Sequence, residues 1–269
     1  MDAKELNDIL RGANLHYADL SDANLRGANL HYANLHGTDL HGTDLRGADL
    51  RGADLYGADL NNADLSDANL SYANLRDANL RDADLSDAKL RDANLCVANL
   101  RYADLCVADL SDAKLRDANL CVADLSDSNL SYANLRDANL RDANLRGADL
   151  YGADLNNADL RGADLYGADL NNADLRGANL NWVNWHEAGG LPVYSAQLKS
   201  SRQNAQLTYI PSLDVATTGC WQDTWQATKD RVDKVYMGKD QRIYQAYQLA
   251  FDYIEKQMEL DKDMEDENK

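Results

Sequence analysis

Residues 51–65 read RGADLYGADLNNADL, which is three copies of a five-residue unit with Ala, Asp and Leu in fixed places. Leucine continues at every fifth position from Leu10 to Leu180, and from residue 13 a small residue, nearly always alanine, stands two positions before each one. This period matches neither the helical period of about 3.6 nor the strand period of about 2, so neither structure buries these residues on one face. A chain that turns a corner in every unit does bury them. The sequence therefore predicts a β-solenoid with alanine and leucine inside.

The unit has the form A-(D/N)-L-x-x, as in Ala53-Asp54-Leu55-Tyr56-Gly57, and over residues 11–185 it resembles the repeat of the pentapeptide-repeat family. The resemblance implies a mainly β fold, a right-handed quadrilateral β-helix with four pentapeptides in each coil. Burial of each leucine then contributes about 1.5–3 kcal/mol to stability. The leucines that we expect in the structural core, one coil apart, are Leu15, Leu35, Leu55, Leu75, Leu95, Leu115, Leu135, Leu155 and Leu175.

The chain is strongly acidic, with a formal net charge of −18 over 269 residues and a pI near 4.5. Such a charge repels nucleic-acid phosphates and anionic membranes and attracts basic protein surfaces. We therefore expect a protein partner with a basic surface, and no direct binding of nucleic acid or membrane. The acidic start, Met1-Asp2-Ala3-Lys4-Glu5, and the lack of a run of about 18 apolar residues favour a cytoplasmic protein.

The charge is uneven along the repeat. Aspartate takes every position before leucine from 149 to 174, against one arginine, and residues 39–64 have a similar excess. Between them, residues 66–145 hold 14 Asp against 9 Arg and Lys, which predicts two acidic belts around a near-zwitterionic waist. Two arginine columns are expected on neighbouring sides, Arg76, Arg116, Arg136 and Arg176 on one and Arg81, Arg101, Arg141 and Arg161 on the next. The candidate interaction belt is Asp149, Asp154, Asp159, Asp164, Asp169 and Asp174.

Longer blocks of sequence are copied at offsets that argue against an active site. Residues 146–160 recur unchanged at 161–175 and at 51–65. The offsets are 15 and 95 residues, and neither is a multiple of the 20 residues in a coil. Each copy therefore lies on a different side of the solenoid from its original. A catalytic arrangement needs several groups held in one geometry. We therefore expect a non-enzymatic structural or interaction scaffold with an acidic surface, and with no catalytic residue, cofactor or metal site.

The family resemblance implies an alternative function. Some pentapeptide-repeat proteins are DNA mimics that occupy the DNA-binding groove of type II topoisomerases, and rows of aspartate about one strand spacing apart are similar to that arrangement. The central core residue of the best-matching mimics is often Phe, whereas here it is Leu throughout. The alternative is an inhibitor of a type II topoisomerase or of another DNA-binding protein. Room for an enzyme exists only in residues 186–269.

Histidine, cysteine and tyrosine offer weaker candidate sites. His16 and His36 are predicted to stack, but no third metal ligand is evident and solvated histidines are the simpler interpretation. Tyr32, Tyr72 and Tyr132 share a face and suggest a partner-binding stripe. The cysteines are too scattered for a disulfide framework or a metal site, so we expect free thiols. They are Cys96, Cys106, Cys121 and Cys220.

The ends of a solenoid expose strand edges that need to be covered. Residues 1–10 are expected to form an N-terminal helical cap on a β-helix that spans residues 11–185. The repeat decays at Trp182 and Trp185, which we take as a cap junction. Residues 186–269 are then expected to form an α+β C-terminal domain.

In this C-terminal domain we predict three strands, two helices and a frayed acidic tail after residue 259. The strands are expected at about 191–198, 206–211 and 214–219, and the helices near 222–237 and 239–260. A homodimer through the C-terminal helices is a further expectation. The stretch Thr218-Gly219-Cys220-Trp221 is similar to the tail domains of some phage and bacterial pentapeptide-repeat proteins. A packed cap is the preferred interpretation, and a dedicated binding domain is the alternative.

Overall fold

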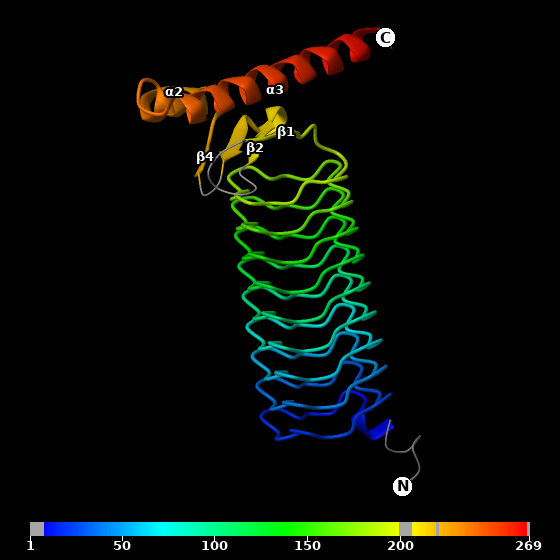
Figure 1. Ribbon diagram of the computed structural model, residues 1–269. Helices are drawn as coiled ribbons and strands as arrows, with labels where there is room; N and C mark the ends of the chain where they lie inside the picture. Colours follow the sequence, from blue (N-terminus) through cyan, green and yellow to red (C-terminus); the bar gives the residue numbers. More distant parts are fainter. Residues whose placement is uncertain (1–7, 199–205, 219–220, 268–269) are drawn as a thin grey trace. The chain divides into compact units, whose positions relative to one another are not determined.

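The computed structural model describes residues 8–198, 206–218 and 221–267. The chain divides into two compact units, of which the first comprises Met1–Asn179 and Val183–Gly190. This unit is the predicted β-helix, drawn as a stack of coils in Figure 1. The second unit comprises Leu180–Trp182 and Leu191–Lys269 and has an α+β fold.

Parallel β-pairing between residues 20 positions apart defines the coil. Isolated parallel bridges join the residue before each leucine to its counterpart in the next coil, from Asn14 paired with Asn34 to Asp169 paired with Gly189. A unit of five residues and a separation of 20 place four repeats in each coil. The structure thus confirms the quadrilateral β-helix.

The solenoid continues beyond the predicted boundary at residue 185. Trp185 takes the leucine position, and the Ala188 N–H donates to its carbonyl oxygen at 3.1 Å, as in the preceding repeats. The next residue, Gly189, pairs with Asp169 of the coil before it. One more unit therefore closes with tryptophan in place of leucine, and the solenoid extends past its predicted end.

Leucine and alanine fill the interior of the solenoid. The core leucines from Leu35 to Leu175 are fully buried. Leu15 is only partly buried, because it belongs to the first coil. Thr38 and Thr43 replace alanine in two units. Their buried hydroxyls are not left unpaired, because each donates a hydrogen bond to a leucine carbonyl of the preceding coil, at 2.9 and 3.0 Å.

Each corner of the coil is a type II turn. The alanine N–H donates to the leucine carbonyl three residues earlier, as from Ala53 to Leu50 at 3.0 Å, and the second residue after leucine has a positive φ, 62° at Gly52 and 59° at Asp67. Glycine, asparagine and aspartate adopt this conformation with the least strain, which explains their frequency there. Branched valine occupies it at Val97, Val107 and Val122, with φ of 63°, 61° and 60°. These three corners are strained.

We expect Val107→Gly to stabilise the solenoid. Glycine removes left-handed strain of about 1–2 kcal/mol and costs about 0.5–1 kcal/mol of backbone entropy, and the exposed valine contributes little burial. The free energy of unfolding in urea should rise by about 0.5–1 kcal/mol. Asp127→Gly, at the same corner one coil away, is the control and should give no gain, since aspartate already tolerates the conformation. A less stable Val107→Gly protein would contradict the strain argument.

The second unit is a four-stranded antiparallel sheet with two helices. The strand order is β1-β2-β3-β4, so β1 is an edge strand. The elements are β1 (Tyr194–Gln197), β2 (Gln206–Ile210), η1 (Pro211–Leu213), β3 (Val215–Thr218), β4 (Trp221–Asp223), α2 (Trp225–Tyr236) and α3 (Gln241–Glu267). The three predicted strands and both predicted helices are present, and β4 was not predicted.

Two details of the predicted helices are wrong. Helix α2 begins at Trp225 rather than near residue 222, because Thr224 is its N-cap and accepts a hydrogen bond from the Ala227 N–H at 3.2 Å. Helix α3 continues to Glu267, so the frayed tail expected after residue 259 is helical that far. The Tyr194 hydroxyl, on β1, donates to Asp261 at 2.6 Å and ties this part of the helix to the sheet.

The core of the second unit lies among the sheet, α2 and α3. Leu207, Ala216, Val232, Phe251 and Ile254 are buried in it. At the other end of the chain, residues 8–10 are helical, and the remainder of the predicted N-terminal cap lies outside the described residues. Within the described part of the chain, no helix has the length and apolar character needed to span a membrane.

Candidate protein interface

The residue before each leucine holds the following corner in place. The Oδ1 atom of Asp149 accepts the N–H of Tyr151 at 2.9 Å, and Oδ1 of Asn134 accepts the N–H of Arg136 at 3.1 Å. Aspartate and asparagine make this bond equally well, which explains why only these two alternate at most such positions. The alanine and leucine pattern predicts only that these side chains face outward. Their structural role means that an aspartate there is no evidence of binding by itself.

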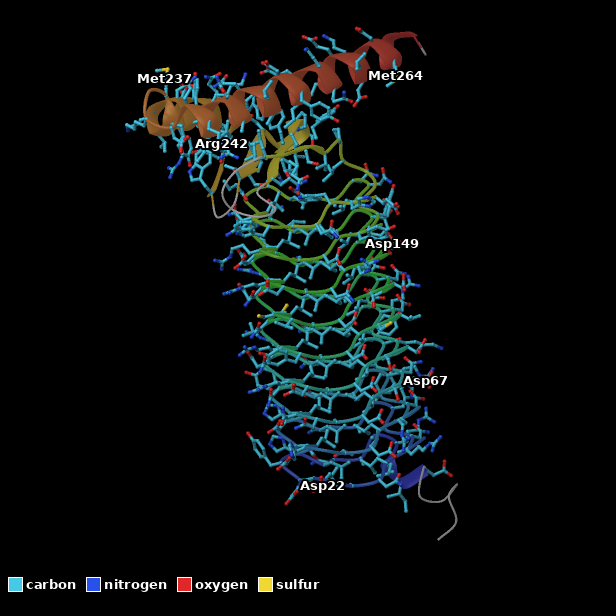
Figure 2. All side chains as sticks on the ribbon, viewed as in Figure 1. Asp22, Asp67, Asp149, Met237, Arg242 and Met264 are labelled. Carbon is cyan, nitrogen blue, oxygen red and sulfur yellow. The ribbon has the colours of Figure 1, made fainter. Side chains whose placement is uncertain are left out.

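The predicted acidic belt is dispersed around the solenoid. Successive members are five residues apart and lie on successive sides, so only Asp149 with Asp169 and Asp154 with Asp174 stack directly. Figure 2 shows Asp149 as one outward member of the set. The six aspartates therefore form a ring of separate carboxylates, and no side of the solenoid carries all of them.

Arginine neutralises half of this belt. Arg161 pairs with Asp159, Arg176 pairs with Asp174 at 2.6 Å, and Arg146 lies 3.3 Å from Asp164. Hydrogen bonds from the arginines hold the pKa values of Asp159 and Asp174 below the usual range. The pairs are largely exposed and add little stability, but they reduce the charge that a partner would meet.

A denser row of carboxylates lies where the sequence analysis predicted a near-zwitterionic waist. Bridges stack Asp64, Asp84, Asp104 and Asp124 on one side of four consecutive coils. The adjoining corner adds three aspartates, and the positions of this side, 63–67, 83–87, 103–107 and 123–127, contain no lysine or arginine. We call this set the acidic ridge. Its members are Asp64, Asp67, Asp84, Asp87, Asp104, Asp124 and Asp127.

Serine side chains hold the inner carboxylates of the ridge. Ser86 donates both its N–H and its hydroxyl to Oδ1 of Asp84, at 2.9 and 2.6 Å, and Ser126 makes the same pair of bonds to Asp124. Asp67, at the outer position, is exposed and points away from the coil in Figure 2. The ridge therefore combines oriented, half-buried carboxylates with exposed ones. Arg46, 3.4 Å from Asp64, marks its lower end.

The remaining sides of the waist are close to neutral. The two predicted arginine columns are present. In the column that holds Arg116 and Arg136, for example, the N–H of Asp117 donates to the carbonyl oxygen of Arg136, so the two arginines lie on the same side of neighbouring coils. Most of these arginines are paired with the aspartate that follows them, for example Arg81 with Asp82 at 3.1 Å, whereas Arg101 donates to the hydroxyl of Tyr102. The charges of the waist thus nearly balance along the sequence, but the negative ones gather on one side of the solenoid. This finding corrects the predicted near-zwitterionic surface.

The weaker candidate sites do not assemble into larger ones. His16 lies against His36 in the next coil, as predicted, with ring centroids 4.7 Å apart and ring planes tilted by 44°. Among the described residues, no group of three or more His, Cys, Asp or Glu side chains is arranged to hold a metal ion. Tyr32, Tyr72 and Tyr132 are exposed at one corner, but glycine or aspartate separates them. They do not form a continuous stripe.

The cysteines and the junction tryptophans lie on separate parts of the chain. Cys96, Cys106 and Cys121 are free and half-buried, and Cys220 lies outside the described residues. Trp182 is exposed at a corner with φ of 67°, and Trp185 is partly buried in the leucine position. The junction role of the two tryptophans stays a prediction.

Comparison with known proteins agrees with the repeat. The family model for pentapeptide repeats matches eight copies, within residues 9–47, 48–87, 78–105, 88–121, 107–142 and 143–181. HetL, a pentapeptide repeat protein involved in heterocyst differentiation regulation from Nostoc sp. strain PCC 7120, is 38% identical over 66% of this chain and 89% of its own, with a TM-score of 0.43. No curated protein matches the chain.

Two further solved structures are similar to parts of this chain. Rfr23 from the cyanobacterium Cyanothece 51142 is 40% identical over 32% of this chain and 58% of its own, with a TM-score of 0.32. QnrB1, a plasmid-mediated fluoroquinolone resistance protein, is 22% identical over 67% of this chain and 84% of its own, with a TM-score of 0.47. With the family model covering most of residues 9–181, and with coils of four five-residue units, the chain belongs to the pentapeptide-repeat family.

Proposed function

We propose that this protein is a non-enzymatic interaction protein and that its acidic ridge binds a basic surface of a partner protein. The observation that carries the proposal is the gathering of seven carboxylates on one side of four coils, where the sequence places no lysine or arginine and Arg46 contacts only the lower end, at Asp64. Like charges held so close repel one another, and a basic partner relieves that repulsion on binding. The copying of surface blocks between sides also supports a scaffold rather than an enzyme.

The spacing of the ridge suits a basic helix lying along the solenoid axis. Neighbouring coils are about 4.8 Å apart, the usual spacing of paired strands. An α-helix rises about 5.4 Å per turn, so lysine or arginine at each turn meets one coil after another with little mismatch over four coils. The serine-held carboxylates at Asp84 and Asp124 are already oriented, so binding costs little side-chain entropy there.

A second candidate function, mimicry of DNA, rests on the charge density of the ridge. Seven carboxylates over three coil spacings, about 14 Å, give about one charge per 2 Å of axis. Duplex DNA carries about one charge per 1.7 Å. A protein that binds DNA through a basic groove therefore meets a similar density on the ridge. This candidate predicts inhibition of a DNA-handling enzyme, which the first does not require.

The experiment compares two sets of Asp→Asn substitutions. The ridge variant replaces all seven ridge aspartates, and the control variant replaces the six dispersed aspartates of the belt. Both should keep the fold. Before leucine, asparagine accepts the same backbone hydrogen bond, as at Asn134, and at the corner it adopts the same positive φ, as at Asn157. We expect the intact protein to bind a helical peptide with lysine or arginine at every turn, and the ridge variant to bind about 10- to 100-fold more weakly. The control variant should stay within about threefold.

Salt and a gyrase assay complete the test. Binding to the ridge should weaken between 0.05 and 0.5 M salt, about the range over which exposed charges become screened. Equal weakening in both variants, or no binding by the intact protein, would contradict a localised site. In a supercoiling assay with a bacterial gyrase, inhibition by the intact protein that the ridge variant loses supports mimicry. Peptide binding without inhibition of the gyrase would exclude mimicry of DNA and support only the binding of a basic partner protein.

A further inference from the structure

Helix α3 has a second apolar face in addition to the one buried in its own unit. Phe251 and Ile254 face the core and are buried. On another side of the helix, four large apolar side chains are exposed, Leu249 by 70%, Tyr253 by 51%, Leu260 by 54% and Met264 by 56%. Soluble monomers seldom gather several large exposed apolar side chains along one line of a helix. This stripe is therefore a candidate contact surface.

The four residues lie along one line of the helix. Their spacings of four, seven and four residues keep them within about 60° of a common direction at about 100° per residue. Arg242 and Lys256 lie on the same line, and Arg242 and Met264 are near opposite ends of α3 (Figure 2). Beside the stripe, α3 and the edge strand β1 border an open groove of about 580 Å³, lined in part by Leu249 and Tyr253.

We propose that a second copy of this chain covers the stripe, with the two α3 helices packed antiparallel about a two-fold axis near Ile254 and Glu255. Charge selects the orientation. A parallel pair opposes Lys256 to the partner's Lys256 and Arg242 to the partner's Arg242, which is repulsive. An antiparallel pair brings Arg242 toward the acidic end of the partner helix, where Asp263 is exposed.

The antiparallel arrangement also matches side chains by type. With the axis between residues 254 and 255, Leu249 opposes the partner's Leu260, and each dimer contains this contact twice. Tyr253 then opposes the partner's Lys256, a pairing in which an ammonium group packs on an aromatic ring. A two-fold interface must be self-complementary, and the stripe meets this condition.

The first test is the mass of the intact protein in solution. Light scattering after size exclusion should give twice the chain mass of 29.8 kDa at tens of micromolar protein. The double variant Leu249→Glu and Leu260→Glu should give the monomer mass, with an unchanged far-ultraviolet spectrum because both leucines are exposed. Met237→Glu, an exposed apolar residue before α3, is the matched control and should remain a dimer. A monomeric intact protein, or a dimeric double variant, would overturn the proposal.

The second test is the orientation of the helices. With the four native cysteines replaced by serine, Leu249→Cys mixed with Leu260→Cys should form a disulfide-linked dimer under mild oxidation. Leu249→Cys alone should link at least tenfold less, because the two copies of residue 249 are about 16 Å apart along the axis. If Leu249→Cys instead forms a disulfide with its own counterpart more readily than with Leu260→Cys, the helices are parallel and the proposed antiparallel orientation is wrong. The dimer should also tighten as salt rises, opposite to ridge binding, because each copy carries a charge of −18.

Discussion

Leu95→Asp is expected to abolish cooperative folding of the solenoid. Leu95 is fully buried in a column of leucines. The substitution leaves a cavity, for which losses of about 2–5 kcal/mol are typical, and buries a carboxylate beside apolar neighbours. The sum approaches the whole stability of an ordinary domain, about 5–15 kcal/mol. Circular dichroism should show loss of the β signal at 25 °C, or a midpoint of urea unfolding far below that of the intact protein.

Two controls identify burial as the cause. Leu95→Met keeps the volume and polarity of the core and should cost less than about 1.5 kcal/mol. Arg91→Ala removes two exposed ion pairs, with Asp92 at 3.5 Å and with Asp112 at 3.8 Å, and should change the free energy of unfolding by less than about 1 kcal/mol. If Leu95→Asp unfolds at the same urea concentration as Arg91→Ala, the inward orientation of leucine is wrong.

Removal of residues 191–269 is expected to leave a folded solenoid that self-associates. The last coil of any solenoid ends in backbone groups with no further coil to pair with, and such an edge recruits other chains. The fragment 1–190 retains the complete last unit, which closes at Gly189. Sedimentation velocity should show dimers and larger species at concentrations where the intact protein shows a single species, while circular dichroism retains the β signal.

Lysine at the last edge provides the control. Asn179→Lys with Asn184→Lys in the fragment should reduce association, because lysine blunts exposed strand edges. The same type of position already accepts lysine at Lys89 and Lys114, so the fold should not suffer. A monodisperse fragment 1–190 of unchanged stability would show that the C-terminal unit is an appendage rather than a cap.

The fold was predictable because its cause is local and repeated. Each unit must place one small and one large apolar side chain inside, and only a corner after every leucine achieves this at a period of five. Trp185 stands in the leucine position, but the sequence pattern did not show that the coil continues past it to Gly189. Strand β4 was missed because Trp221 fits the apolar face of the following helix, and the N-cap at Thr224 decides the boundary.

The acidic ridge was not predicted because charge was counted along the chain. Neighbours on the ridge such as Asp64 and Asp84 are 20 residues apart, and the arginines between them in sequence point to other sides. Sorting the sequence by its position within the 20-residue coil would have found the ridge. The hydrogen bonds from Ser86 and Ser126 to the ridge carboxylates could not be predicted from the sorted sequence, because they depend on the geometry of the corner.

The four-unit coil also determines how this protein can change length over evolution. Gain or loss of one five-residue unit preserves the interior, since alanine and leucine stay in phase, but rotates everything beyond it by a quarter of a turn. One extra unit after Leu85 would move Asp104 and Asp124 off the side that holds Asp64 and Asp84. Gain or loss of 20 residues changes the length and keeps every column aligned. Selection for folding alone therefore permits length changes in steps of five, whereas selection for the ridge permits only steps of 20 within it.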